Sequence, residues 1–207
     1  MRPAVDDEPV ARLVDVAFTV AGEALPRDHR RELAAAIGAV LPWWTTQPGA
    51  GVHRLNVAAG GGPLALLSNR TRLTLRVPRE RAADAAALAG AALRLGAATL
   101  SVGAAQTREL RPHGTLYAHL VAAPEGDDEV AFLDAVRAEL AALGVPGRAI
   151  CGRRQVVESG ALQGYSLMLD GLDVPGALRV LDAGIGPHRR WGCGVFVAHK
   201  SAVAVGS

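Results

Sequence analysis

The chain alternates between strand-like and helix-like spacing of its apolar residues, and the same order occurs twice. In the first half, residues 12–20 (RLVDVAFTV) alternate apolar and polar positions, which is typical of a strand. Leu33, Ile37 and Val40 then recur at helical spacing. Pro78 precedes an Ala-rich segment, as expected at the first turn of a helix. The pattern predicts strand, helix, strand, strand, helix and strand at residues 12–20, 28–40, 53–57, 71–77, 79–93 and 98–110.

The second half repeats this plan. One face of residues 127–143 carries Val130, Leu133, Val136, Leu140 and Leu143. Ser159-Gly160 joins two alternating runs, which indicates a hairpin. The pattern predicts strand, helix, strand, strand, helix and strand at residues 115–122, 127–143, 153–158, 162–169, 174–183 and 195–198.

Both halves therefore have the element order of a ferredoxin-like unit. We predict an α+β protein with two tandem ferredoxin-like (βαββαβ) domains, at residues 11–110 and 111–200. Domains of about 100 residues bury a workable core.

Composition narrows the functional classes only in part. A net charge of +2 does not by itself indicate nucleic acid, because binding depends on where the charge lies. The basic side chains are nearly all arginines, which suit bidentate phosphate recognition. No membrane-length apolar run and no signal peptide is visible, so we expect a cytoplasmic protein without membrane contact. Cys151 and Cys193 lack the spacing of a zinc site or a disulfide framework.

The segment at residues 184–200 (GIGPHRRWGCGVFVAHK) carries the most specific chemistry. Four glycines bracket a basic and aromatic stretch. The glycines are Gly184, Gly186, Gly192 and Gly194. The stretch between them contains His188, Arg189, Arg190 and Trp191. Glycine allows the backbone close to a ligand, arginine pairs with phosphate, and tryptophan stacks on a base. The alternative is a glycine-rich turn with solvated arginines. A dinucleotide-binding loop is excluded, because this segment follows a helix and precedes a strand.

The segments that carry a resemblance to a known family are VDVAFTV, LPRDH, LPWW followed by GVH, SNRTRLTLRVP, GRRQVV and GPHRRWGCGVFV. Through these segments the chain resembles the RAMP superfamily over nearly its whole length. It is most similar to the CRISPR repeat-RNA endoribonucleases, the "Cas six" family, in their short variant. The resemblance implies cleavage of CRISPR precursor RNA within its repeats, without metal or cofactor, by attack of a ribose 2′-hydroxyl that leaves a 2′,3′-cyclic phosphate. It also implies repeat RNA and mature crRNA as partners, and other effector-complex subunits as possible ones.

In that family a histidine usually transfers the proton, and an imidazole suits this role near neutral pH. His53 is the first candidate, because it follows the first helix, and Arg54 beside it is a candidate phosphate partner. The alternative for His53 is a surface position at the start of a strand. His29 is the second candidate, at the N-terminus of the first helix, where the helix dipole lowers its pKa and attracts phosphate.

Further residues are predicted to contact RNA or to serve structure. The candidates for RNA contact are Arg153 and Arg154 on the second-half hairpin, and His188, Arg189, Arg190, Trp191 and Lys200 near the C-terminus. Trp43 and Trp44 fit a core better than a stacking platform. Asp127, Asp128 and Glu129 fit a helix start better than a metal site. His113 and His119 receive no role.

Three rival functions differ in what they require. A non-catalytic RAMP subunit that binds repeat RNA shares the fold and the glycine loop, so the sequence leaves this alternative open. A two-histidine phosphoesterase needs two His-x-Thr/Ser motifs, whereas only His113-Gly114-Thr115 fits. A ligand-sensing ferredoxin-like regulator does not account for arginine pairs beside glycines.

Overall fold

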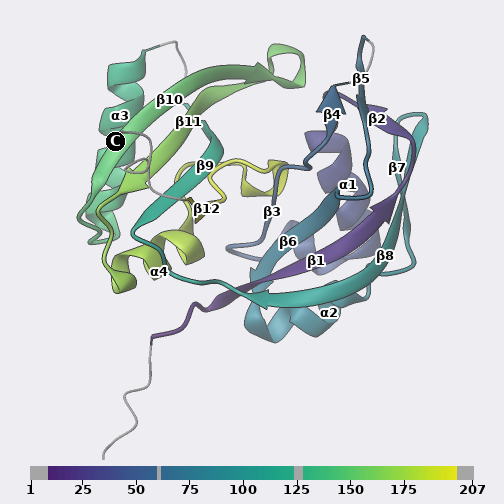
Figure 1. Ribbon diagram of the computed structural model, residues 1–207, viewed down its shortest axis with the longest axis horizontal. Helices are drawn as coiled ribbons and strands as arrows, with labels where there is room; N and C mark the ends of the chain where they lie inside the picture. The colour runs from purple at the N-terminus through teal and green to yellow at the C-terminus, as the bar shows by residue number, and fades with distance from the viewer. Residues whose placement is uncertain (1–8, 60–61, 124–127, 200–207) are drawn as a thin grey trace, which may run out of the picture.

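The computed structural model describes residues 9–59, 62–123 and 128–199. Two larger antiparallel sheets lie side by side, and the C-terminal segment that precedes the last strand runs between them (Figure 1). In the part of the chain that the structure describes, no helix is long and apolar enough to cross a membrane.

The first half forms a five-stranded sheet in the order β3-β6-β1-β8-β7. Its strands are β1 (Leu13–Ala21), β3 (Gly51–Val52), β6 (Arg72–Pro78), β7 (Ala92–Leu95) and β8 (Ala98–Glu109). Strand alternation places Val14, Val16 and Phe18 on one face, where they are buried. The helices α1 (Arg30–Val40) and α2 (Ala82–Ala86) cover that face and complete one hydrophobic core.

The second half forms a four-stranded sheet in the order β10-β11-β9-β12. Its strands are β9 (Thr115–Ala122), β10 (Arg148–Val157), β11 (Leu162–Asp170) and β12 (Val197–Ala198). The helices α3 (Glu129–Ala142) and α4 (Val174–Ala183) contribute to a second core. Asp128 caps α3 by accepting hydrogen bonds from two backbone N–H groups, so its predicted role at a helix start is confirmed.

Smaller elements connect these parts. A three-stranded sheet contains β2 (Ala24–Pro26), β4 (Ala58–Ala59) and β5 (Leu64–Leu66). Short 3-10 helices are η1 (Pro42–Thr45), η2 (Arg79–Arg81), η3 (Glu158–Gly160) and η4 (Arg189–Trp191).

The pairing of strands is the same in both halves. The first strand of each unit lies between the third and the fourth, and the second strand pairs with the outer side of the third. Thus β1 lies between β6 and β8 with β3 outside β6, and β9 lies between β11 and β12 with β10 outside β11. The predicted α+β class with tandem ferredoxin-like units is confirmed.

The helix predicted at residues 79–93 is wrong beyond residue 86. After α2 the chain turns through Gly90, whose φ is +86°, and residues 92–95 form strand β7. Leu93 and Leu95 are buried in the first core, and β7 pairs with β8 as a hairpin. The many alanines of this segment are compatible with a helix, which led to the prediction. Leu93 and Leu95 are two residues apart and are both buried, which is the spacing of a strand with one buried face.

The strand predicted at residues 53–57 is also wrong. Pairing with β6 ends at Val52, apart from one further hydrogen bond from the His53 backbone N–H to the Thr74 carbonyl. The Asn56 carbonyl instead accepts a hydrogen bond from the Thr71 hydroxyl. The Thr71 side chain therefore satisfies a backbone carbonyl that would pair with a neighbouring strand if residues 53–57 formed one.

Candidate functional site

A pocket of about 220 Å³ opens between the two halves. The first half contributes the N-terminus of α1 and the segment after β3. The second half contributes β9, the end of β10 and η4. Three histidines line this pocket, His29, His53 and His119.

His29 is the N-cap residue of α1 and is buried. Its Nδ1 lies 2.8 Å from the Pro26 carbonyl oxygen. A carbonyl only accepts, so Nδ1 carries the hydrogen and Nε2 keeps a lone pair. Burial lowers the pKa of His29 below its ordinary value, and the nearby Arg30 charge acts in the same direction. His29 is therefore a neutral imidazole with an acceptor nitrogen at neutral pH.

The turn between β10 and β11 is bound to the N-terminus of α1. The Asp28 carboxylate accepts hydrogen bonds from the backbone N–H groups of Glu158 and Ser159, at 2.9 and 2.8 Å, and from the Ser159 hydroxyl. Glu158 in return accepts from the Arg30 backbone N–H at 2.8 Å. Figure 1 shows the β10–β11 hairpin reaching across toward the first half. These bonds hold the second-half wall of the pocket beside His29.

His119 enters the pocket from β9 in the second half, and sequence reasoning assigned it no role. Its Nδ1 lies 3.4 Å from Arg54 Nη1. Burial and the positive charges of Arg54 and Arg30 lower the pKa of His119 to about 4. No local motif marks this residue, because only the packing of the two halves brings it into the same pocket as the N-terminus of α1.

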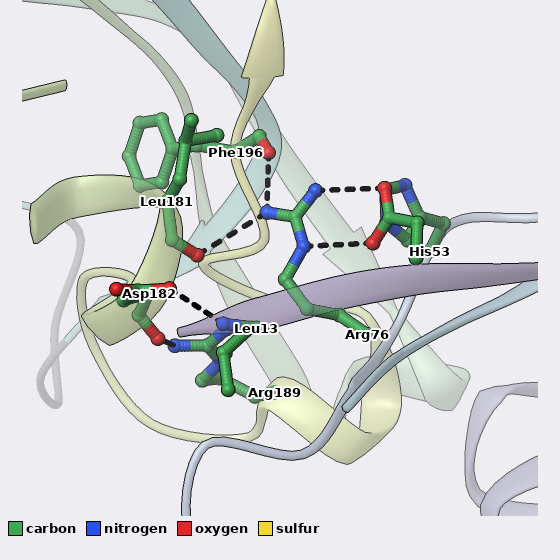
Figure 2. Close-up of polar contacts among 8 residues, drawn as sticks. Leu13, His53, Arg76, Leu181, Asp182, Arg189 and Phe196 are labelled. Carbon is green, nitrogen blue, oxygen red and sulfur yellow. Dashed lines mark hydrogen bonds and ion pairs between the residues drawn. The ribbon is translucent and has the colours of Figure 1, made fainter. Parts of the chain in front are cut away.

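His53 lies in a polar network between the halves (Figure 2). Its Nε2 is 3.0 Å from Asp15 Oδ1, and the same carboxylate accepts two hydrogen bonds from Arg76, at 2.9 and 3.0 Å. Arg76 also donates to the carbonyls of Phe196 and Leu181 in the second half. Burial lowers the pKa of His53. Burial acts to raise the pKa of Asp15, but His53 and Arg76 outweigh it and hold that pKa below its usual range.

Two glycines of the predicted loop are required by close backbone contact. Gly184 and Gly194 both have positive φ, +70° and +63°. A Cβ on Gly184 would lie 2.5 Å from the Gly194 carbonyl oxygen, and a Cβ on Gly194 would lie 2.0 Å from the Ile185 carbonyl oxygen. The loop is therefore folded tightly on itself, which positions η4 against the first half.

Trp191 and His188 form a flat aromatic stack at the edge of this loop. Their ring centroids are 4.4 Å apart with an angle of 4° between the planes. The Arg31 guanidinium lies 5.2 Å from the centroid of the Trp191 ring. Trp191 lines the pocket, so this stack adjoins the three histidines.

Arg189 and Arg190 connect the loop to its surroundings. Arg190 donates to the carbonyls of Trp44 and Gln47, both at 2.8 Å. Arg189 donates to the Asp182 carbonyl at 2.7 Å (Figure 2), and burial lowers its pKa to about 10. The positions of these guanidinium groups favour a structural role over the predicted contact with RNA.

Arg54 lines the pocket, whereas Arg153 and Arg154 do not. Arg153 and Arg154 are exposed on β10, at the outer edge of the second sheet, and Arg154 contacts Gln163 at 3.3 Å. Lys200 lies outside the described residues.

Trp44 is fully buried in the first core. Among residues 9–59, 62–123 and 128–199, no group of three or more His, Cys, Asp or Glu side chains is placed to hold a metal ion.

Comparisons with known proteins agree with this architecture. The solved RAMP protein described as binding different RNA substrates has a TM-score of 0.66 at 12% identity, over 90% of this chain and all of that one. A Cas6-related protein from Pyrococcus furiosus has a TM-score of 0.60 at 12% identity, over 89% of this chain and 97% of that one. At this identity the similarity supports the fold.

Sequence comparison gives the family. The CRISPR-associated endonuclease Cas6 of Myxococcus xanthus (strain DK1622) is 35% identical over 196 residues, which is 94% of this chain and 85% of that protein. The sequence model of the family described as Cas6 Crispr matches residues 14–201. The chain therefore belongs to the Cas6 family of CRISPR proteins.

Proposed function

We propose that this protein is an endoribonuclease that cleaves CRISPR precursor RNA within its repeats. One observation carries the proposal: a buried histidine with an acceptor nitrogen lines a basic pocket formed by both halves of a Cas6-family chain. The similarity to the Myxococcus endonuclease supports the same reaction class. The partners that we expect are the repeat RNA, the mature crRNA and subunits of an effector complex.

In the proposed reaction, the 2′-hydroxyl beside the scissile phosphate gives its proton to a histidine and attacks phosphorus. The 2′-oxygen–phosphorus bond forms and the bond from phosphorus to the 5′-oxygen breaks. The products are a 2′,3′-cyclic phosphate and a 5′-hydroxyl. Proton transfer by a positioned side chain typically contributes about 10² to 10⁴ in rate.

Between the two candidates, we propose His29 as the proton acceptor and His53 as the second candidate. His29 lies in the pocket with Arg30 and Arg54, whose positive charges favour a phosphate, and its Nε2 keeps a lone pair. His53 instead donates from Nε2 to the Asp15 carboxylate, which Arg76 also binds, so this ring belongs to the buried network between the halves. The order predicted from the sequence alone is thereby reversed.

The test uses purified protein and a cognate repeat hairpin. We expect cleavage in the presence of EDTA, since the nucleophile comes from the RNA itself. Replacing the 2′-hydroxyl at the cut site with hydrogen should abolish cleavage and leave binding intact. Dependence on added magnesium, or cleavage of the deoxy substrate, would contradict the mechanism. Tight binding without cleavage of any repeat would favour the non-catalytic RAMP subunit.

We propose that Arg153 and Arg154 contribute to RNA binding through phosphate. Changing both to alanine should weaken repeat affinity and reduce the slope of log affinity against log salt, by roughly 0.7 to 0.9 for each phosphate that the protein no longer neutralises. Arg94→Ala is the matched control, because Arg94 is also exposed on a strand but lies on β7 of the first-half sheet. An unchanged affinity and salt slope in the double variant would assign both arginines to the solvated surface.

A further inference from the structure

The proposed proton acceptor leaves His119 of β9 unexplained. This histidine comes from the second half and lines the same pocket as His29. Both imidazoles have pKa values lowered by burial, and both belong to walls that are held together by the contacts of Asp28 with the β10–β11 turn. A rearrangement that separated the halves would separate the two histidines.

The neighbours of the two rings give them opposite hydrogen-bonding roles. A guanidinium group has donors and no acceptor, so the contact with Arg54 makes Nδ1 of His119 the acceptor and leaves the hydrogen on Nε2. His29 has the reverse arrangement, because Pro26 binds the hydrogen on Nδ1 and leaves a lone pair on Nε2. The pocket therefore holds one imidazole that accepts at Nε2 and one that donates at Nε2.

The charges around His119 favour an anion beside it. Arg54 and Arg30 line the pocket, and their positive charges disfavour protonation of the His119 ring. The pocket lining has three arginines, Arg27, Arg30 and Arg54, and one carboxylate, that of Asp28, so positive charge exceeds negative charge there. A neutral His119 ring next to two guanidinium groups is suited to donate a hydrogen bond to a phosphate oxygen.

We propose that His119 is a further catalytic residue, whose Nε2–H donates a hydrogen bond to a non-bridging oxygen of the scissile phosphate while His29 Nε2 takes the 2′-hydroxyl proton. The inference rests on the proposed function. Negative charge on the phosphate oxygens increases as the 2′-oxygen attacks, and a fixed donor stabilises that charge. The departing 5′-oxygen takes its proton from water, and His119 keeps its own.

The test compares two substitutions of His119 with one of His29 by single-turnover cleavage of the cognate repeat. His119→Ala should reduce the rate about tenfold to a hundredfold, the range expected when a hydrogen bond to a charged group is removed. His119→Gln should recover most of this rate, because an amide N–H donates without transferring a proton. His29→Gln should remain slow, because an amide is not a base. A parental rate for His119→Ala, or no recovery in His119→Gln, would overturn the inference.

A phosphorothioate substrate separates contact with phosphate from a structural role. Sulfur accepts hydrogen bonds weakly, so sulfur at the contacted non-bridging position should slow the parent protein. The same sulfur should cause no further slowing in His119→Ala. An equal sulfur effect in both proteins would overturn the contact even if the alanine variant is slow. If the parent protein cleaves no repeat, the proposed function and this inference fail together, whereas the failures above concern His119 alone.

Discussion

His29→Ala should slow single-turnover cleavage of the repeat by about 10² to 10⁴ while repeat affinity stays within a few-fold. The reason is that the acceptor nitrogen of His29 is proposed to remove the 2′-hydroxyl proton, and alanine has no group that can do so. The side chain is buried at the start of α1, so its loss removes little surface on which RNA can lie. Single-turnover rates and equilibrium binding of the 2′-deoxy repeat measure the two quantities separately.

The controls use the other histidines. His199→Ala should cleave at the parental rate, because His199 is exposed and contacts the Tyr117 ring outside the pocket. His53→Ala should lower thermal stability, because it removes a partner of Asp15. If His53→Ala folds normally and carries the large rate loss while His29→Ala cleaves normally, the proton acceptor is His53.

The pH profile gives a second readout for His29. The neutral ring is the active form, so cleavage is lost as pH falls and His29 becomes protonated. Burial lowers the pKa of His29, so kcat/KM should fall only below the ordinary histidine pKa of about 6.5. Arg30 and Glu158 are the charged groups that act on this ring, in opposite directions. A midpoint above 6.5 that disappears in His29→Ala would contradict the proposed environment of the base.

Arg76→Met should lower the free energy of unfolding by about 3–5 kcal/mol. Arg76 is 1% exposed and binds Asp15 in the first half and two backbone carbonyls in the second. Methionine fills similar volume but leaves the partly buried Asp15 carboxylate and two carbonyls without this donor. Because small domains are stable by only about 5–15 kcal/mol, the change should be plain in urea unfolding.

Arg79→Met is the matched control for this measurement. Arg79 also makes a two-bond contact with a carboxylate, that of Glu109, but the side chains of this pair are 44% and 57% exposed. Surface pairs of this kind contribute about 0–1 kcal/mol, so Arg79→Met should change stability little. If both variants lost the same free energy of unfolding, burial would not be the reason that the Arg76 network stabilises the protein.

The fold followed from the sequence where burial repeats with a clear period. The strand at residues 12–20 and the helix at residues 127–143 were predicted to within a few residues, since each buries one regular stripe of apolar side chains. The prediction at residues 79–93 failed because alanine fits helix and strand cores alike. There the pairing of β7 with β8 decided the conformation, and a partner strand is not encoded in local spacing.

For the site, the sequence by itself determined the glycine loop and the two candidate histidines, because these residue types and positions carry the family's pattern. Only the tertiary structure decided which side chains meet. It brought His119 of β9 into the pocket that His29 also lines, placed His53 against Asp15, and directed Arg190 to backbone carbonyls. The physical reason is that an imidazole or a guanidinium has the same donors in any fold, while its role depends on the acceptors and charges that long-range packing places beside it.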